Sequence, residues 1–221
     1  MTCAFTTAAV RLLASHADAK NAGPMERYMK NQFPFLGIKA PLRRELSRQL
    51  FREHGIPQDW EQVVARLWAL PEREYQYVAM DLLAKTKKQL TPEHLPLVVK
   101  WITTKSWWDT VDYLAAHTTG TLFSRYPELI RPNSTDWVKG DNIWLARTAL
   151  LFQLSYKSRT DQELLFALIE SCAASREFFI AKAIGWSLRE YAKTEPEAVR
   201  DFVERTALAN LSRREALKHL G

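Results

Sequence analysis

The chain has 221 residues, of which 47% are hydrophobic and 25% are charged, so it is long enough to bury a substantial core. Only seven residues are glycine, and we find no linker, low-complexity tract or charge run that would mark a domain boundary, so we expect a single domain over residues 1–221. The formal net charge of +6 favours an anionic partner.

The cysteines and histidines argue against a disulfide framework or a metal centre. The two cysteines, Cys3 and Cys172, lie far apart, and the histidines show no metal-ligand spacing. The N-terminal apolar stretch is interrupted by Thr6, Thr7 and Arg11, and no segment approaches the length of a membrane span. We therefore expect a cytoplasmic protein without cofactor, metal or membrane contact, and a monomer.

Helical periodicity recurs from end to end, without sustained period-two alternation. The start signals are a cap before proline at Thr91-Pro92 and three capping boxes, Thr160-x-x-Glu163, Thr194-x-x-Glu197 and Ser212-x-x-Glu215. We expect stops at Gly55 and Gly120. The sequence predicts helices over residues 4–19, 24–33, 41–54, 59–69, 72–88, 92–104, 107–119, 122–130, 142–157, 161–174, 177–192, 196–209 and 212–219.

The spacing of these helices favours an all-α solenoid. A pair of helices about every 35 to 40 residues is the period of HEAT-type repeats, in which antiparallel pairs stack beside one another. Such solenoids present a concave face, which here we expect to form a basic groove suited to a long, rod-like ligand. An irregular helical bundle remains the alternative.

Arg147 is the first residue that does not fit its position on a helix. It falls in the middle of the apolar stripe formed by Ile143, Leu150 and Leu154. A buried, unpaired guanidinium costs several kcal/mol, so Arg147 must find an anion or open onto a groove. A structural salt bridge to a neighbouring helix is the simpler interpretation.

Trp108 and Asp112 share a face of the helix predicted over 107–119. They are four residues apart, and their neighbours on that face are small, as Ala115 and Ala116 illustrate. A large aromatic ring and a carboxylate bordered by small side chains indicate a crevice. The alternative is an exposed aspartate beside an interface tryptophan.

Trp186 lies on the cationic face of the helix predicted over 177–192. It is roughly 160° from the core stripe, with Phe179 beside it. This placement suits stacking on a base or sugar while cations hold phosphates, although a contact within the protein is also possible. The cations of this face are Lys182, Arg189 and Lys193.

A fourth candidate is the segment from Gly37 to Arg44. Its loop amides lead into a predicted helix start, and Lys39 and Arg43 add positive charge. Helix starts of this kind bind phosphate groups well, so we expect a phosphate contact here, although a solvated charged face would look the same.

Four strings of the sequence resemble one known family over about residues 5 to 220. They are MERYMKNQFPFLGIKAPLRREL (25–46), SWWDTVD (106–112), ARTALLFQLSYK (146–157) and FFIAKAIGWSLREYAKTEP (178–196). They are similar to the DNA alkylation repair family of HEAT-like alkylpurine glycosylases, the AlkD-like proteins. This resemblance implies a cofactor-free α-solenoid that releases positively charged N3- and N7-alkylated purines from duplex DNA.

The resemblance also assigns roles to single residues. It implies that Asp112 is the catalytic carboxylate, that Trp108 and Arg147 act with it, and that Trp186 contacts the lesion. Tyr28 is similar to the family's N-terminal cleft residue, whereas Ala146 departs from the basic residue expected there in many relatives. The DNA-contacting residues that we expect are Trp186, Tyr28, Phe179, Lys39, Arg43, Lys182, Arg189 and Lys193.

These expectations give a monofunctional glycosylase acting on N3-methyladenine, 7-methylguanine or bulkier adducts, and located on the nucleoid when bound to DNA. A purine alkylated at N3 or N7 is already cationic, so one carboxylate is enough for the chemistry. Two alternatives remain. The first is a non-catalytic protein that binds distorted or branched DNA, and the second is a HEAT-type protein-interaction scaffold.

Overall fold

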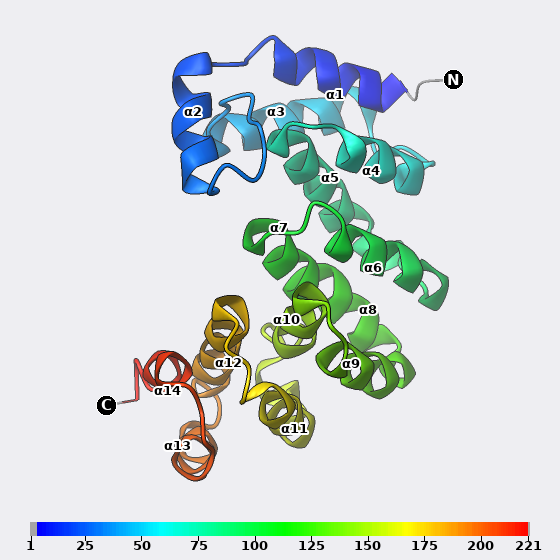
Figure 1. The fold of residues 1–221 in the computed structure, drawn as a ribbon. Coiled ribbons are helices and arrows are strands. Elements are labelled where there is room, and N and C mark those ends of the chain that lie inside the picture. The colour runs from blue at the N-terminus through cyan, green and yellow to red at the C-terminus, as the bar shows by residue number, and fades with distance from the viewer. Residues whose placement is uncertain (1–3, 221) are drawn as a thin grey trace. The chain divides into compact units, whose positions relative to one another are not determined.

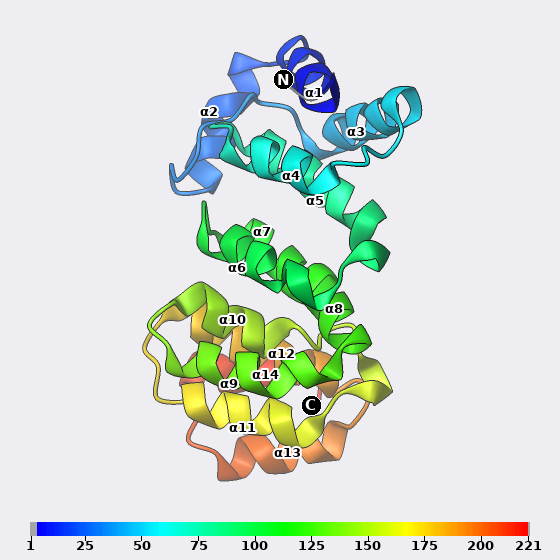
Figure 2. The same ribbon diagram turned by 90° about the vertical axis from the view of Figure 1, so that its right-hand side faces the viewer.

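The computed structural model describes residues 4–220, all of whose regular elements are helical (Figure 1). Residue contacts divide the chain into two compact units, unit 1 up to Lys88 and unit 2 from Gln89. The all-helical class predicted from the sequence is confirmed. Within each unit, consecutive helices joined by a few residues pack side by side, as in the antiparallel pairs of HEAT-like repeats (Figures 1 and 2).

Unit 1 is built on two packed helix pairs. Helix α4 packs along α5, and α1 packs against α3. The packed faces of these helices include Leu13, Val63, Leu67 and Val78, which are completely buried. The helices are α1 (Ala4–Ala14), α2 (Ala19–Tyr28), α3 (Ala40–His54), α4 (Trp60–Ala69) and α5 (Arg73–Thr86).

The segment between α2 and α3 is fixed by one buried carboxylate. Glu74 is fully buried in α5, and its two oxygens accept hydrogen bonds from the backbone amides of Leu36, Gly37 and Ile38 at 2.9, 2.9 and 3.0 Å. Charged acceptors make stronger hydrogen bonds than neutral ones, so the chain that leads into α3 has a defined path.

Unit 2 has a continuous core in which Phe123, Phe152, Ile169, Leu188 and Phe202 are fully buried. Helix α10 packs on α9 and α12, and α12 packs on α14. The helices are α6 (Leu95–Thr103), α7 (Trp108–Tyr113), the π-helical segment η3 (Leu114–Thr119), α8 (Gly120–Arg125), α9 (Ile130–Lys139), α10 (Ile143–Leu151), α11 (Gln162–Cys172), α12 (Phe178–Tyr191), α13 (Pro196–Arg205) and α14 (Asn210–Ala216).

The predicted helix stop at Gly120 is wrong. Gly120 lies inside one continuous helical run from α7 to α8, at a point where another segment of backbone comes close. A Cβ at Gly120 would lie 2.5 Å from the carbonyl oxygen of Phe152. The Gly120 carbonyl in turn accepts a hydrogen bond from the Tyr156 hydroxyl at 2.7 Å. The glycine therefore allows the backbone after α10 to contact this run. Gly55 does follow α3, as predicted.

Helix α9 was missed because Pro132 and the polar residues after it are typical of a loop. Pro132 lies in the first turn of α9, where a backbone N–H would have no helical partner. The side chains of Asn133 and Ser134 donate to the carbonyls of Leu129 and Ile130 at 2.7 and 2.8 Å. The residues that suggested a loop are therefore compatible with the first turns of a helix, where their polar side chains bond to backbone carbonyls.

Several predicted boundaries were also wrong. Helix α2 begins at Ala19 because Asp18 caps it, α10 ends at Leu151, and Lys157 has a φ of 55° that no α-helix accommodates. The predicted capping boxes at Thr194 and Ser212 do not cap: the N-cap of α13 is Glu195, and Ser212 lies inside α14.

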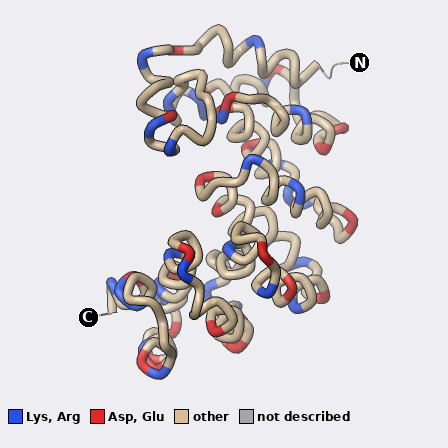
Figure 3. Tube along the Cα trace, viewed as in Figure 1, with Lys and Arg blue, Asp and Glu red and all other residues tan. Residues whose placement is uncertain are grey.

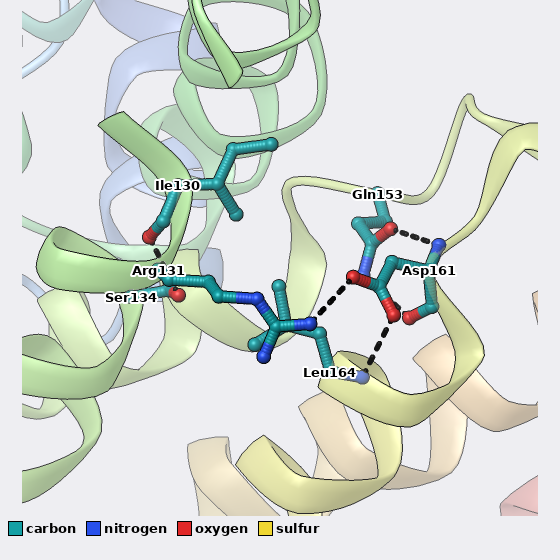
Figure 4. A network of polar contacts seen from close by, with 6 residues as sticks. All are labelled: Ile130, Arg131, Ser134, Gln153, Asp161 and Leu164. Carbon is teal, nitrogen blue, oxygen red and sulfur yellow. Dashed lines mark hydrogen bonds and ion pairs between the residues drawn. The ribbon is translucent and has the colours of Figure 1, made fainter. Parts of the chain in front are cut away.

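Asp161, not Thr160, caps α11 and connects three segments of unit 2 (Figure 4). Its carboxylate accepts from the amide of Leu164 at 3.0 Å and from the Arg131 guanidinium at 3.3 Å. Its backbone N–H donates to the Gln153 side chain at 2.8 Å. The start of α11 is thus tied to α9 and to the turn after α10.

No described helix has both the length and the apolar character that crossing a membrane requires. Cys3 lies outside the described residues, whereas Cys172 is a buried free thiol whose pKa is raised to about 11 by that burial.

Candidate functional site

An ion pair between α10 and α7 lies at the centre of the candidate site in unit 2. The Arg147 guanidinium donates from Nε to Oδ1 of Asp112 at 2.6 Å and from Nη2 to Oδ2 at 2.8 Å. Its Nη1 donates to the backbone carbonyl of Phe179 at the start of α12. Arg147 is 4% exposed, so the cation predicted in an apolar stripe does find an anion.

The Asp112 carboxylate is partly accessible, with 16% of its side chain exposed. Burial raises the pKa of Asp112, and the hydrogen bonds and charge of Arg147 act in the opposite direction. The nearby charge of Asp109 adds a smaller upward effect. Arg147 therefore favours the ionised carboxylate at a position where desolvation opposes it.

Three aromatic side chains pack together beside this pair. The Phe179 ring lies 5.0 Å from both Trp107 and Trp144, and the two tryptophans are 5.8 Å apart. The Nε1 donor of Trp107 is buried without a hydrogen-bond partner. Because Phe179 also supplies the carbonyl that accepts from Arg147, this aromatic cluster helps to hold the guanidinium in place. The sequence pointed to Phe179 but not to this role.

The two tryptophans predicted at the site occupy different environments. Trp108 is the first residue of α7 and is half-buried. Trp186 is also half-buried and packs against the hydrophobic core of unit 2, which is the contact within the protein that the sequence leaves open as an alternative. The predicted core stripe of α12, formed by Ile180, Ile184 and Leu188, is buried.

The cations of α12 are paired with acidic residues. Glu215 of α14 accepts from Lys182 at 3.0 Å and from Arg189 at 2.5 Å, and these bonds hold the pKa of Glu215 below its usual value. Lys193 follows the end of α12 and pairs with Glu190 of that helix. Figure 3 shows basic and acidic positions next to one another in this region. The sequence predicts Glu215 in a capping box with Ser212 and gives no sign of this pairing.

Gly185 explains how α14 can lie so close to α12. A Cβ at Gly185 would be 2.5 Å from the Cβ of Glu215 and 2.9 Å from the carbonyl oxygen of Ser212. The Ser212 hydroxyl donates to the carbonyl of Ala181 at 2.9 Å. A glycine directly before Trp186 thus brings Glu215 within reach of the α12 cations.

The remaining predicted contact residues belong to unit 1. Tyr28 ends α2 and is 69% exposed, Lys39 is exposed at the N-cap of α3, and Arg43 follows in the first turn. That all predicted cations face one continuous concave surface stays a prediction. Within the described part of the chain, no cluster of three His, Cys, Asp or Glu side chains has a geometry that could hold a metal ion.

These features define a helical-repeat protein with an accessible carboxylate fixed by a buried guanidinium. The family model for DNA alkylation repair enzymes matches residues 9–220, and the chain belongs to this family. A solved structure described as a predicted DNA alkylation repair enzyme from Enterococcus faecalis is similar, with 36% sequence identity and a TM-score of 0.86. The match covers 93% of this chain and 97% of that one. No curated protein matches the chain.

Proposed function

We propose that this DNA alkylation repair protein is a monofunctional DNA glycosylase. Its substrates are positively charged N3- and N7-alkylated purines in duplex DNA, and it hydrolyses the N-glycosidic bond. The observation that carries the proposal is the Asp112 carboxylate, 16% exposed and held by two hydrogen bonds from the buried Arg147. Family membership supports DNA as the partner.

The positive charge of the substrate reduces the number of catalytic groups that the protein must supply. The bond between C1′ and the purine nitrogen breaks, and its electron pair neutralises the cationic base, which needs no general acid to leave. The sugar becomes an oxocarbenium-like cation, and water adds to C1′ and loses a proton. Ordinary glycoside hydrolysis uses two carboxyl groups, but here one is sufficient.

In this mechanism Asp112 stabilises the sugar cation and orients the attacking water, because a fixed carboxylate in a partly desolvated site stabilises developing positive charge strongly. Arg147 keeps that carboxylate ionised and in position. Trp108 and Trp186 present ring faces to the deoxyribose and to the cationic lesion, since aromatic faces attract cations.

The other predicted contacts serve binding. Phe179 lies beside the ion pair, and Tyr28 offers an exposed ring in unit 1. The phosphate-binding cations in the proposal are Lys39, Arg43, Lys182, Arg189 and Lys193. Because Lys182 and Arg189 pair with Glu215, their contribution to phosphate binding is reduced.

The test uses a labelled duplex with a single 7-methylguanine. After incubation with the protein, heating in alkali converts an abasic site into a strand break. Breaks that depend on protein support the glycosylase. Retarded but intact DNA would contradict it and favour the binding protein, and the absence of both would favour the interaction scaffold. A parallel duplex with N3-methyladenine and one with a bulkier adduct rank the lesions.

A further inference from the structure

A pocket of about 500 Å³ opens in unit 1, far along the chain from Asp112 and Arg147. It lies between α2, α3 and α5, and its volume falls in the range of small-molecule sites. Aromatic rings and thioethers dominate its lining, with Tyr28, Phe35, Tyr77, Met25 and Met29 contributing. Thioether sulfurs make favourable contacts with rings, and a flexible methionine adapts to a flat guest.

The same pocket has a cation in its wall. The Arg43 guanidinium lies 4.7 Å from the centre of the Tyr77 ring, and 13% of its side chain is exposed. Its carboxylate partner, Asp81, is 3.8 Å away and already accepts a hydrogen bond from Ser47 at 2.7 Å. Burial lowers the pKa of Arg43, which reflects the cost of desolvating its charge. This cation is therefore poorly neutralised and would gain from an anion.

The pocket is preformed on its loop side. Glu74 fixes the backbone of Leu36, Gly37 and Ile38, and the Ile38 side chain that lines the pocket is 2% exposed. Lys39 follows at once and adds a second cation to the lining. The loop wall of the pocket is thus fixed before any ligand arrives, which reduces the ordering cost of binding.

We propose that this pocket binds one nucleotide, with the base among Tyr28, Tyr77 and Phe35 and the phosphate at Arg43 and Lys39. Ring faces stack on any base, and a guanidinium binds phosphate oxygens in pairs. The ligand comes either as a free mononucleotide or as an unpaired nucleotide of a DNA strand, and both present the same chemistry. Tyr28, Lys39 and Arg43 are also among the DNA contacts proposed above, but nucleotide binding to this pocket is measured without any excision, so the two proposals can fail separately.

The test is calorimetry with deoxyadenosine monophosphate, deoxyadenosine, decanoate and a single-stranded oligo-deoxyadenylate. The variants are Arg43→Gln, which removes the cation, and Ala40→Trp, whose bulky side chain fills part of the pocket and leaves every cation in place. Arg48→Gln is the matched control, since Arg48 is exposed and about 140° around α3 from Arg43. Thermal unfolding checks that each variant is folded.

For a free nucleotide, we expect the monophosphate to bind more tightly than deoxyadenosine or decanoate. Its affinity should fall at least tenfold in both pocket variants and stay the same in Arg48→Gln. If only the oligonucleotide binds and Ala40→Trp weakens it tenfold, the ligand is a nucleotide of a strand. The proposal is overturned if decanoate binds best, or if folded Ala40→Trp binds both the monophosphate and the oligonucleotide like the wild type.

Discussion

The Arg147 guanidinium holds both oxygens of the Asp112 carboxylate, at 2.6 and 2.8 Å, while its third nitrogen donates to the backbone of Phe179. Three helices thereby fix one acidic group: α7 carries it, α10 carries its partner, and α12 anchors that partner. A structural salt bridge and a catalytic pair would share this geometry. Substitutions of Asp112 and Arg147 distinguish the two, because only a catalytic pair affects the excision rate as well as the stability of the fold.

The pH dependence of excision should have an acidic limb set by Asp112. Because burial raises the pKa of Asp112, the rate should begin to fall above the ordinary aspartate value of 3.8 as the pH decreases and the carboxylate is protonated. Arg147 lowers this pKa, so Arg147→Gln should move the limb to higher pH. Single-turnover rates between about pH 4 and 8, corrected for spontaneous depurination, measure both limbs. Superimposable limbs in the two proteins would argue against this coupling.

Substituting both partners should separate stability from activity. Arg147→Met leaves a partly desolvated carboxylate without its partner and should lower the free energy of unfolding by about 3 kcal/mol, and adding Asp112→Asn should restore part of that loss. Excision by the double variant should be little slower than by either single variant, because the pair acts as a unit. Denaturant unfolding and single-turnover excision of 7-methylguanine provide the two readouts. Additive losses in both would show that the two residues act independently.

Removing Glu215 should strengthen binding to undamaged duplex. Glu215→Gln releases Lys182 and Arg189, so affinity at low salt should rise by roughly threefold or more and should fall more steeply with added salt. Glu204→Gln is the matched control, because it changes the net charge equally at an exposed glutamate of α13. Fluorescence anisotropy over a salt series gives both quantities. An equal gain in the two variants would indicate a general charge effect.

Gly185→Ala should destabilise the contact between α12 and α14. Its Cβ would meet Glu215 and Ser212 well inside contact distance, so we expect a loss of about 1–3 kcal/mol in the free energy of unfolding. Gly140→Ala is the control, since the nearest atom to its Cβ would be 3.4 Å away and the change should stay within about 0.5 kcal/mol. Urea unfolding compares them, and equal effects would refute the close-packing explanation.

Helical periodicity predicts both residues at the centre of the site, Arg147 and Asp112. An arginine inside an apolar stripe requires an anion, and this physical demand identified Arg147. The small residues next to Asp112 indicated that its helix face borders a crevice. Periodicity within one helix says nothing about the partner on another helix, so the pairing of Arg147 with Asp112 became visible only in three dimensions.

The errors of the sequence predictions have several physical causes. The cationic face of α12 was visible in the sequence, but Glu215, which neutralises part of it, lies on another helix. Helix α9 was lost because Pro132 is favourable in a first turn and unfavourable later, and the sequence did not show where the turn begins. Gly120 looked like a stop because close backbone packing leaves no local signal.

The most direct measurement is single-turnover excision of 7-methylguanine from duplex DNA by Asp112→Asn. This substitution keeps the shape and removes the charge that stabilises the sugar cation. We expect the rate to fall by about 10² or more, or roughly 3 kcal/mol, with duplex affinity unchanged or slightly higher. Asp109→Asn, the same change one turn earlier in α7, should retain excision within a few-fold. A folded Asp112→Asn protein that excises at the wild-type rate would contradict the proposed catalytic role of Asp112.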